Sequence, residues 1–353
     1  MTERFAIIGA GNGGLAFACY LASRGGEVVA LCDRRADWLQ ALRQAGTLRA
    51  VGPHLEYEMA LPKLVAEPAD AVREATVILV VTTANAHEEV AVSLAPALQS
   101  EQRVLLCPGY LGGALVFHKA LRGAGCRTEP EVGELALLPF AARVLEPGVV
   151  GIRAIKRWVL CAAFRRQRTA ALVEQLANYL PMLQAARDVL EVGLNNVNPV
   201  VHVPGTLLNL GLVDAGLLVK MDFYEVLVGR VGKVIEMVDQ ERLRLGVALG
   251  YSLLPLPEFD RKSYEGVERA YSVGEAAKLW PEATNVPPRY LDEDVPMGLV
   301  PLVSLGQAVG LRLSASELLI ELACLVQGVD YWAAGRTLKR LDVRDVDELR
   351  GES

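Results

Sequence analysis

Short apolar runs alternate with amphipathic segments over the first half of the chain. The runs RFAII, EVVALC, ATVILVV and RVLLC have the length and β-branched content of strands, and most are apolar at consecutive positions, as in strands covered on both faces. Between them, GLAFACYLASRG and RADWLQALRQAG carry apolar residues at helical spacing and end at glycines. Strands that alternate with helices predict a parallel, doubly wound sheet, that is, an α/β Rossmann domain. We place this domain at residues 1–186.

The pattern changes near Glu191, after which long segments with helical periodicity replace the strand-like runs. The clearest are DFYEVLVGRVGKVIEMVDQERLRLGVALG and ASELLIELACLVQG, and no convincing strand follows. Residues 187–353 are therefore predicted to form an all-α domain. Ser314 and Glu317, in the segment SASE, match a capping box that opens one of its helices. The proline-rich stretch between residues 255 and 288 is predicted to be irregular and is a candidate binding loop.

A glycine-rich turn, GAGNGG, joins the first predicted strand to the first predicted helix. In the G-x-G-x-x-G pattern, Gly9 allows the tight turn, Gly11 lets the backbone approach a pyrophosphate, and Gly14 lets the helix pack close to the strand. The pyrophosphate then faces the helix N-terminus, where N–H groups and the helix dipole attract anions. Because strand, glycines, helix and second strand come in order, the turn predicts a dinucleotide site. Its predicted cofactor-binding residues are Gly9, Gly11, Asn12, Gly13 and Gly14.

Asp33 ends the second predicted strand, about 20 residues after the glycines, where a carboxylate accepts hydrogen bonds from the adenosine ribose. A carboxylate there also repels a 2′-phosphate, which favours NAD. Arg34 and Arg35 follow at once, and guanidinium groups beside this position can hold a 2′-phosphate. The predicted cofactor is NAD, with NADP as the alternative and Arg34 as a further candidate for cofactor binding.

The segment NNVNPVVHVPGTLLNLG holds one of only four histidines in the chain. Apolar residues cover most of a helix drawn through it, so its polar face must be hydrogen-bonded inside the protein or line a wet cavity. Pro204 cannot donate to the carbonyl of Val200 and predicts a kink beside His202. A catalytic histidine and a core histidine that hydrogen-bonds neighbouring asparagines both fit this pattern. The polar residues, at steps of three or four, are Asn195, Asn198, His202, Thr206 and Asn209.

An acidic partner for His202 is available in RYLDEDVPMGLVP, which contains Asp292, Glu293 and Asp294. Asp294 precedes a proline-containing helix start and fits a simple N-cap. An aspartate fixed there can also hydrogen-bond an imidazole and hold its tautomer. Arg289, just ahead, offers a guanidinium fork for a substrate carboxylate.

Composition narrows the class of protein. The net charge of −6 argues against a nucleic-acid surface, which needs dense Lys and Arg. The six cysteines form no C-x-x-C pair, which favours reduced thiols in the cytoplasm over disulfides or a zinc site, and no metal site is predicted. Every apolar run is interrupted well short of about 18 residues, so no membrane span is expected. The first residues run directly into a strand, so no signal peptide is expected. Long apolar helices in the second half make a homodimer the expected assembly.

Four motifs along the chain carry a resemblance to a known family: GAGNGGLAFACYLA, PGYLGGALVF, NNVNPVVHVPGTLLN and RYLDEDVPMGLVPLVSLG. With these motifs the chain resembles the opine dehydrogenases, the octopine/nopaline dehydrogenase family, and among them the bacterial N-(carboxyalkyl)amino-acid dehydrogenases. The resemblance covers nearly the whole chain, and its last two motifs are specific. The resemblance implies a Rossmann domain followed by an all-helical domain with substrates in the cleft between them. It also implies that an amino acid is condensed with a 2-oxo acid and that the imine is reduced by NAD(P)H.

Carried over by position, the family's catalytic histidine falls on His202, its aspartate on Asp294 and its carboxylate-binding arginine on Arg289. Asn198, one turn before His202, is expected to hydrogen-bond the substrate or the cofactor amide. The chain departs from the family at Cys107, where relatives often have Asn, and in LLPFAAR, where the usual segment is of the Pro-Tyr-Ala-Cys-Arg type. Arg143 in that segment is a further candidate for substrate binding. The other three histidines match no family role.

Two alternatives remain open at this point. A 3-hydroxyacid or ketopantoate-type dehydrogenase shares this domain arrangement but relies on a Lys and Asn pair, which the region of Lys220 and Lys233 does not reproduce. A non-enzymatic dinucleotide sensor needs no general base, so a polar stripe directed at a carboxylate argues against it.

Overall fold

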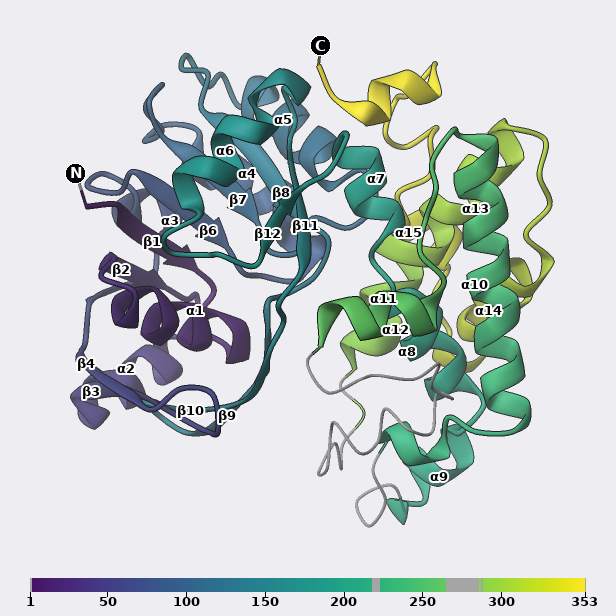
Figure 1. Cartoon of the computed structure of the whole chain (residues 1–353), viewed down its shortest axis with the longest axis horizontal. Helices are drawn as coiled ribbons and strands as arrows, with labels where there is room; N and C mark the ends of the chain where they lie inside the picture. The colour runs from purple at the N-terminus through teal and green to yellow at the C-terminus, as the bar shows by residue number, and fades with distance from the viewer. Residues whose placement is uncertain (1, 218–222, 265–285, 287, 353) are drawn as a thin grey trace. The chain divides into compact units, whose positions relative to one another are not determined.

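The computed structural model describes residues 2–217, 223–264, 286 and 288–352 (Figure 1). Its contacts divide the chain into two compact units. The first unit comprises Met1–Gly109, Gly113–Val192 and Arg350–Ser353, and the second comprises Tyr110–Gly112 and Gly193–Leu349. The division near Val192 lies a little after the boundary predicted at residue 186, and two short segments leave their sequence neighbours to join the other unit.

An eight-stranded sheet forms the centre of the first unit, in the order β12-β11-β8-β7-β6-β1-β2-β5. All of its neighbouring strands run parallel except β8 and β11, which are antiparallel. The predicted Rossmann fold is confirmed, and the antiparallel pair is an addition that the sequence pattern did not predict. The strands are β1 (Arg4–Ile8), β2 (Glu27–Cys32), β5 (Lys63–Val65), β6 (Val77–Val80), β7 (Arg103–Leu106), β8 (Glu131–Leu135), β11 (Val159–Ala163) and β12 (Leu183–Ala185).

The consecutive apolar residues of these strands are explained by burial on both faces of the sheet. Every residue of β6 is buried, as is every residue of β1 after Arg4. Figure 1 shows helices packed about this sheet. The helices of this unit are α1 (Asn12–Ser23), α2 (Ala36–Ala45), α3 (Pro68–Ala71), α4 (His87–Leu94), α5 (Gly113–Gly123) and α6 (Thr169–Leu176), and α7 (Val189–Leu194) crosses the division between the units.

A second, four-stranded sheet packs beside α1 in the order β4-β3-β10-β9. Its strands are β3 (Thr47–Val51), β4 (Tyr57–Ala60), β9 (Phe140–Glu146) and β10 (Val149–Ile155). Buried and exposed positions alternate along β3, because only one face of this sheet is covered. The short, alternating pattern explains why these strands were not predicted from apolar runs.

The last residues of the chain return to the first unit. The backbone of Glu352 pairs with Phe164 and Arg166 at 2.8 and 2.9 Å, and Arg350 lies 3.7 Å from the buried Asp188 carboxylate. The second unit is helical throughout its described residues, as predicted. The stretch between residues 255 and 288 was predicted to be irregular, and this is wrong for Leu256–Ser263, which form helix α11. Residues 265–285 and 287 of this candidate binding loop lie outside the described part of the chain.

The helices of the second unit are α8 (Asn198–Leu207), α9 (Leu210–Asp214), α10 (Arg230–Ala248), α11 (Leu256–Ser263), α12 (Arg289–Asp292), α13 (Val300–Ala308), α14 (Ser314–Gln327) and α15 (Tyr331–Ala334). Short 3-10 turns η4 (Phe223–Val226) and η7 (Val346–Arg350) and a π-helical turn η6 (Val295–Leu299) complete the unit. Within the described ranges, none of the helices combines the length and apolar character that crossing a bilayer requires.

The capping box predicted at Ser314 and Glu317 is wrong. Helix α14 begins at Ser314, but its first N–H groups donate to a buried carboxylate from α10. Glu241 accepts from Ala315 N at 2.7 Å and from Ser316 N at 2.9 Å. The carboxylate therefore neutralises the positive end of the α14 dipole from a position distant in sequence.

Candidate active site

The glycine turn after β1 has the geometry that a bound pyrophosphate needs. Gly9 has φ +105°, and a Cβ there would lie 2.6 Å from the carbonyl oxygen of Val81. A Cβ on Gly14 would overlap the carbonyl of Gly9, whereas one on Gly11 would meet open space. Helix α1 begins at Asn12 without an acidic residue in its first turn and without a side-chain cap. These residues fit a dinucleotide phosphate, because the backbone is approachable and the positive end of the helix is not otherwise neutralised.

Asn12 and Gly13 hold this turn against its surroundings. The Asn12 Oδ1 accepts a hydrogen bond of 2.8 Å from the N–H of Val144 on β9. Gly13 packs so closely on Val81 and Leu138 that a side chain there would have to displace them. The structure gives both residues a role in shaping the turn, and direct contact of either with the cofactor stays a prediction.

Asp33, at the end of β2, has both carboxylate oxygens engaged. Oδ2 accepts from Ala10 N at 3.1 Å, and the Arg35 side chain donates to Oδ1 at 2.9 Å and to Oδ2 at 2.8 Å. Burial on its own would raise the pKa of the Asp33 carboxyl, but these hydrogen bonds and the charge of Arg35 lower it below its ordinary value. Arg34 is exposed and lies 3.9 Å from Glu89, so the guanidinium paired with Asp33 is that of Arg35. Contact of Arg34 with the cofactor stays a prediction.

His202 and Asp294 form a buried pair in the second unit. The His202 Nδ1 lies 2.8 Å from Asp294 Oδ2, and the other oxygen, Oδ1, accepts a 2.8 Å hydrogen bond from the hydroxyl of Tyr110. The His202 ring stacks on Tyr290 with 3.7 Å between ring centroids and 12° between planes. Asp294 is fully buried, and its side chain makes no capping hydrogen bond to the turn that it precedes. The carboxylate is therefore committed to His202 and Tyr110, not to a helix start.

Local sequence explains how the two residues meet. His202 lies in the middle of α8, and Asp294 directly precedes the π-helical turn η6, a distortion often found at functional sites. A Cβ on Gly298 would overlap the ring of Pro199, so this glycine lets η6 approach α8 closely. Asn198 and Thr206 are one turn to either side of His202 on α8. Asn195 lies between α7 and α8, so its predicted place on the helical face is wrong.

Arg289 opens α12, next to Tyr290. Its guanidinium lies 5.1 Å from the centre of the Tyr290 ring and 3.8 Å from Glu293 Oε2, and its side chain is 41 % exposed. Burial would lower the pKa of Arg289, but Tyr110, Tyr290 and the carboxylates of Asp294 and Glu293 raise it above its ordinary value. The cation is thus maintained beside the His202–Asp294 pair, as a site for a substrate carboxylate requires.

Arg143 belongs to the first unit, half-buried on β9 opposite Gly151. The structure brings His202, Asp294 and Arg289 together in the second unit, and the glycine turn and Asp33 in the first. Tyr110 and Tyr290 were missed as site residues. Tyr110 follows β7 in the glycine-flanked segment PGYLGG, and the carboxyl end of a parallel strand is where such a fold binds ligands, so its position was a usable signal.

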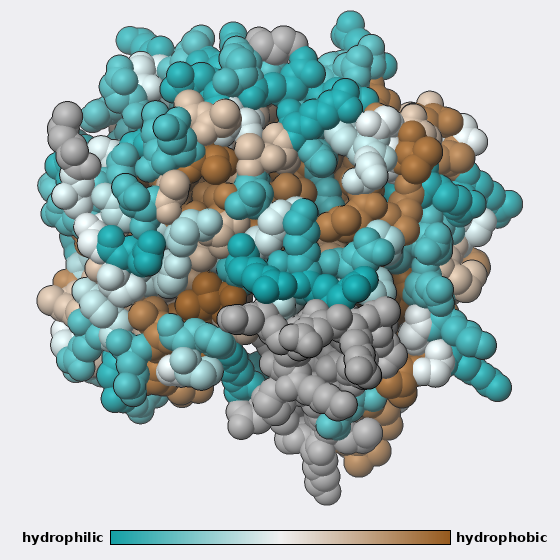
Figure 2. All heavy atoms as spheres, in the orientation of Figure 1, coloured by the Kyte–Doolittle hydropathy of each residue, from teal (hydrophilic) through white to brown (hydrophobic). Residues whose placement is uncertain are grey.

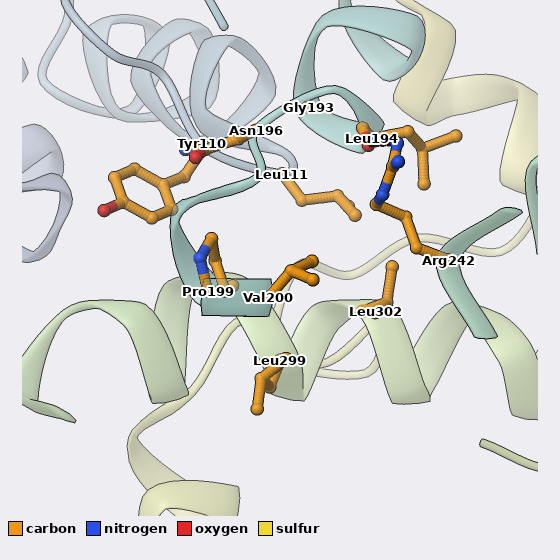
Figure 3. A pocket seen from close by; sticks show the side chains of 11 residues that line it. Tyr110, Leu111, Gly193, Leu194, Asn196, Pro199, Val200, Arg242, Leu299 and Leu302 are labelled. Atoms are coloured by element: carbon orange, nitrogen blue, oxygen red, sulfur yellow. Dashed lines mark hydrogen bonds between the residues drawn. The ribbon is translucent and has the colours of Figure 1, made fainter. Parts of the chain in front are cut away.

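A small cavity lined by residues of the second unit adjoins Tyr110 (Figure 3). Tyr110 lies at one end of its lining and Arg242 at the other, with Asn196 and Pro199 among the side chains between. Its volume suits about one water molecule. The cavity is therefore too small to bind an amino acid or an oxo acid.

Comparison with known proteins identifies the family. Residues 185–327 match the family model of the NAD/NADP octopine/nopaline dehydrogenase α-helical domain, and residues 5–123 match that of ketopantoate reductase PanE/ApbA. The opine dehydrogenase of Arthrobacter sp. (strain 1C) is 33 % identical over 345 residues, which cover 96 % of this chain and 95 % of that protein. The chain belongs to the opine dehydrogenase family. It is accordingly an NAD(P)-dependent oxidoreductase of the class that joins an amino acid and a 2-oxo acid by reductive condensation.

Solved structures of other opine dehydrogenases have the same fold as this chain. Octopine dehydrogenase in complex with NADH and agmatine superposes with a TM-score of 0.76 at 20 % identity, covering 99 % of this chain and 98 % of that one. Yersinopine dehydrogenase bound to NADP⁺ superposes with a TM-score of 0.73 at 16 % identity, covering 99 % and 97 %. The ketopantoate reductase family model matches only residues 5–123, whereas residues 185–327 match the octopine/nopaline model. A solved ketopantoate reductase from Ralstonia eutropha JMP134 superposes over 92 % of this chain and 98 % of that one, with a TM-score of 0.65 at 19 % identity, so it shares the fold. Of the two candidate lysines for the ketopantoate-type alternative, Lys233 is exposed on α10 and Lys220 lies outside the described residues.

Proposed function

We propose that His202 is the general acid and base of this opine dehydrogenase, that Asp294 orients it, and that Arg289 binds a substrate carboxylate. The observation that carries the proposal is the 2.8 Å contact between His202 Nδ1 and Asp294 Oδ2 in a buried setting. An aspartate that accepts from Nδ1 fixes the tautomer and assigns proton exchange with the substrate to Nε2. Asn198, one turn away on α8, is proposed to hydrogen-bond the substrate or the cofactor amide.

The chemistry divides between the cofactor and the chain. When bound, NAD(P)H supplies the hydride that reduces the imine formed from the amine and the oxo acid. In the condensation, the protonated His202 polarises the oxo-acid carbonyl as the amine attacks. In the reverse direction, neutral His202 takes a proton from the water that hydrolyses the imine. Arg289 acts mainly by orientation, because a fixed carboxylate holds the reacting carbon in one position.

We propose that residues 1–186 supply the dinucleotide site and residues 187–353 the catalytic and substrate groups. Gly9, Gly11, Asn12, Gly13 and Gly14 would hold the pyrophosphate at the start of α1. The open space at Gly11 and the uncapped first turn support this assignment. NAD is the proposed preferred cofactor, since Asp33 would accept hydrogen bonds from the ribose hydroxyls. Arg34 and Arg143 remain candidates for cofactor and substrate binding.

The substrates are proposed to be an amino acid and a short 2-oxo acid, by analogy with octopine dehydrogenase, which was solved with L-arginine and with pyruvate. A matrix of amino acids against pyruvate, glyoxylate and 2-oxoglutarate, followed by loss of NADH or NADPH, tests the proposal. Turnover should require both an amine and an oxo acid. Consumption with the oxo acid alone would support a hydroxyacid dehydrogenase instead, and binding without turnover would support a sensor. His202→Ala should lose most turnover while still binding NADH, and equal turnover would reject the assignment.

We also propose that the chain forms a homodimer in the cytoplasm. Figure 2 shows brown apolar side chains among polar ones over the second unit. Leu318 and Leu325, two turns apart on α14, are 70 % and 79 % exposed, and Val247 on the adjoining α10 is 74 % exposed. Apolar side chains this exposed favour association. Leu325→Glu should convert a dimer, measured by light scattering, into a monomer, whereas a parent protein that is already monomeric would contradict the proposal.

A further inference from the structure

We propose that Tyr110 is a positioning residue for the catalytic pair, which it serves by fixing the carboxylate of Asp294 from the side opposite His202. This inference rests on the catalytic roles proposed above for His202 and Asp294. The Tyr110 hydroxyl donates to Asp294 Oδ1 at 2.8 Å while His202 occupies Oδ2 at the same distance. Tyr110 is 1 % exposed and Asp294 is fully buried, so this hydrogen bond is shielded from bulk solvent.

The backbone at Tyr110 is in a conformation that the residue itself disfavours. Tyr110 has φ +61°, a left-handed value that a bulky side chain rarely adopts. Such outliers persist where the surroundings over-determine them, and they cluster at active sites. The residue in this unfavourable conformation is the one whose hydroxyl reaches Asp294, so the strain coincides with the hydrogen bond to the catalytic pair.

The residues on both sides of Tyr110 hold this conformation in place. A Cβ on Gly109 would overlap the carboxylate of Glu134, a buried residue that accepts a 2.8 Å hydrogen bond from Ala114 N at the start of α5. On the other side, the carbonyl of Leu111 accepts a hydrogen bond from the buried Arg336. The segment Tyr110–Gly112 belongs to the second unit although its sequence neighbours belong to the first. The backbone is thus held on both sides of Tyr110 in the sequence, independently of the hydrogen bond from the Tyr110 hydroxyl to Asp294.

The electrostatic surroundings keep Tyr110 a hydrogen-bond donor. Burial, followed by the charges of Asp294 and Glu293, raises the pKa of the Tyr110 phenol well above its ordinary value, so the hydroxyl retains its proton. Among the described residues, the charged or titratable groups near the pair include Tyr290, which stacks on His202, and Arg289, which lies beside Tyr290 and Glu293. On α10, which packs against α8, Arg242 is paired with Asp239 and Glu241 caps α14.

Removing the hydroxyl alone gives a clear expectation. In Tyr110→Phe the Asp294 carboxylate keeps His202 as its donor but loses its second anchor, so it is free to rotate. With one hydrogen-bond donor fewer, the Asp294 carboxylate interacts more strongly with His202, and this favours the protonated form of the imidazole. We expect kcat to fall about 3- to 10-fold with little change in the KM for NADH. In the reductive direction, the loss of activity at high pH should move to higher pH than in the parent.

Tyr331→Phe is the matched control. Tyr331 on α15 donates to Asp292 Oδ1 at 3.0 Å. This is a comparable tyrosine–aspartate bond in the same acidic segment, but its acceptor is not the aspartate that pairs with His202. This variant should leave kcat and the pH profile unchanged. A loss in Tyr331→Phe as large as that in Tyr110→Phe would mean that such bonds act through stability alone, and it would overturn the proposal.

A spectroscopic readout separates this inference from the catalytic assignment. The chain has four histidines, and His202→Gln identifies the His202 ring resonances by difference. The pH midpoint of those resonances should rise in Tyr110→Phe and stay in place in Tyr331→Phe. An unmoved midpoint refutes the positioning role, whatever the activity. If His202→Ala retains turnover, the catalytic assignment fails, and the midpoint still decides whether Tyr110 acts on the pair.

A second variant covers the case in which Tyr110→Phe does not fold. Asp294→Asn leaves Tyr110 in place, and it should shift the ¹³Cζ resonance of Tyr110 while that of Tyr331 stays unchanged. A Tyr110 resonance that does not respond would show that the hydrogen bond is absent in solution and would overturn the proposal.

Discussion

The Arg35 side chain donates hydrogen bonds to both oxygens of Asp33, the carboxylate that is proposed to bind the adenosine ribose. This pairing sets up a competition that the charge of Asp33 alone would not predict. With NAD, the ribose hydroxyls must share the carboxylate with Arg35. With NADP, the 2′-phosphate is repelled by Asp33 but attracted by Arg35. Replacing Arg35 with Ala should therefore lower the use of NADPH and leave the use of NADH unchanged or slightly better.

The magnitude follows from Coulomb's law. A guanidinium about 4 to 5 Å from a bound 2′-phosphate would contribute about 1 to 4 kcal/mol across the range of dielectric between water and a protein surface. The Arg35 side chain is 54 % exposed, so solvent screens it and the lower part of this range applies. About 1 to 2 kcal/mol corresponds to about a 5- to 30-fold loss in kcat/KM for NADPH in Arg35→Ala. Asp33→Asn should act in the opposite direction, because it removes the repulsion.

The assay is the ratio of kcat/KM for NADPH to that for NADH, measured with one saturating amino acid and oxo acid at about 0.1 M and 1 M salt. Arg34→Ala is the comparison, since Arg34 is 85 % exposed and lies 3.9 Å from Glu89. The Arg35 effect should exceed the Arg34 effect and should shrink at high salt. An unchanged ratio in Arg35→Ala, or an equal loss in Arg34→Ala, would refute the reasoning. A parent enzyme that prefers NADPH would show that the proposed role of Asp33 is wrong.

Three further predictions concern stability and the glycine turn. Glu241→Ala leaves the first N–H groups of α14 without their buried acceptor. The free energy of unfolding, measured by denaturant titration, should therefore fall by about 3 to 5 kcal/mol. A decrease of less than about 1 kcal/mol would argue against this cap. Burial lowers the pKa of His118 below its ordinary value, so its contribution to stability is present above about pH 6.5 and is lost as the pH falls through the folded pKa. His118→Gln should therefore lose less melting temperature between pH 7 and pH 5 than the parent, and parallel curves would contradict this. Gly14→Ala forces a Cβ into the Gly9 carbonyl, so calorimetry should show weaker NADH binding, and unchanged affinity would show that the turn adjusts freely.

The fold was predictable where burial produces a simple hydrophobic pattern in the sequence. Strands such as β6 are apolar at every position because both faces are covered, and that pattern needs no tertiary information. The second sheet produces no such pattern. Along β3 only alternate residues are buried, and over five residues such a pattern does not separate a strand from a turn or a helix end. The antiparallel pairing of β8 with β11 depends on chain direction, which composition does not encode.

The sequence indicated which residues belong to the candidate site, but not which of them contact one another. His202 stood out as a histidine in a buried, apolar helix, and the family resemblance supplied Asp294 as its partner. The 2.8 Å contact joins residues 92 positions apart, and it depends on the close approach of η6 to α8 at Gly298 and Pro199. No periodicity in either segment specifies that approach.

Two groups of polar residues that local sequence explained as helix caps make hydrogen bonds to distant residues instead. Asp294 fitted an N-cap, and its carboxylate binds His202 and Tyr110 instead. Ser314 and Glu317 fitted a capping box, and the first N–H groups of that helix bind Glu241 instead. In both places the local sequence identified a group that had to be paired, because an unpaired polar group is costly to bury. A distant partner satisfied the requirement, since a buried carboxylate gains more from several fixed donors than from one local donor beside solvent. A polar residue at a predicted helix start in this chain therefore marks where a hydrogen bond is needed, and packing decides which residue makes it.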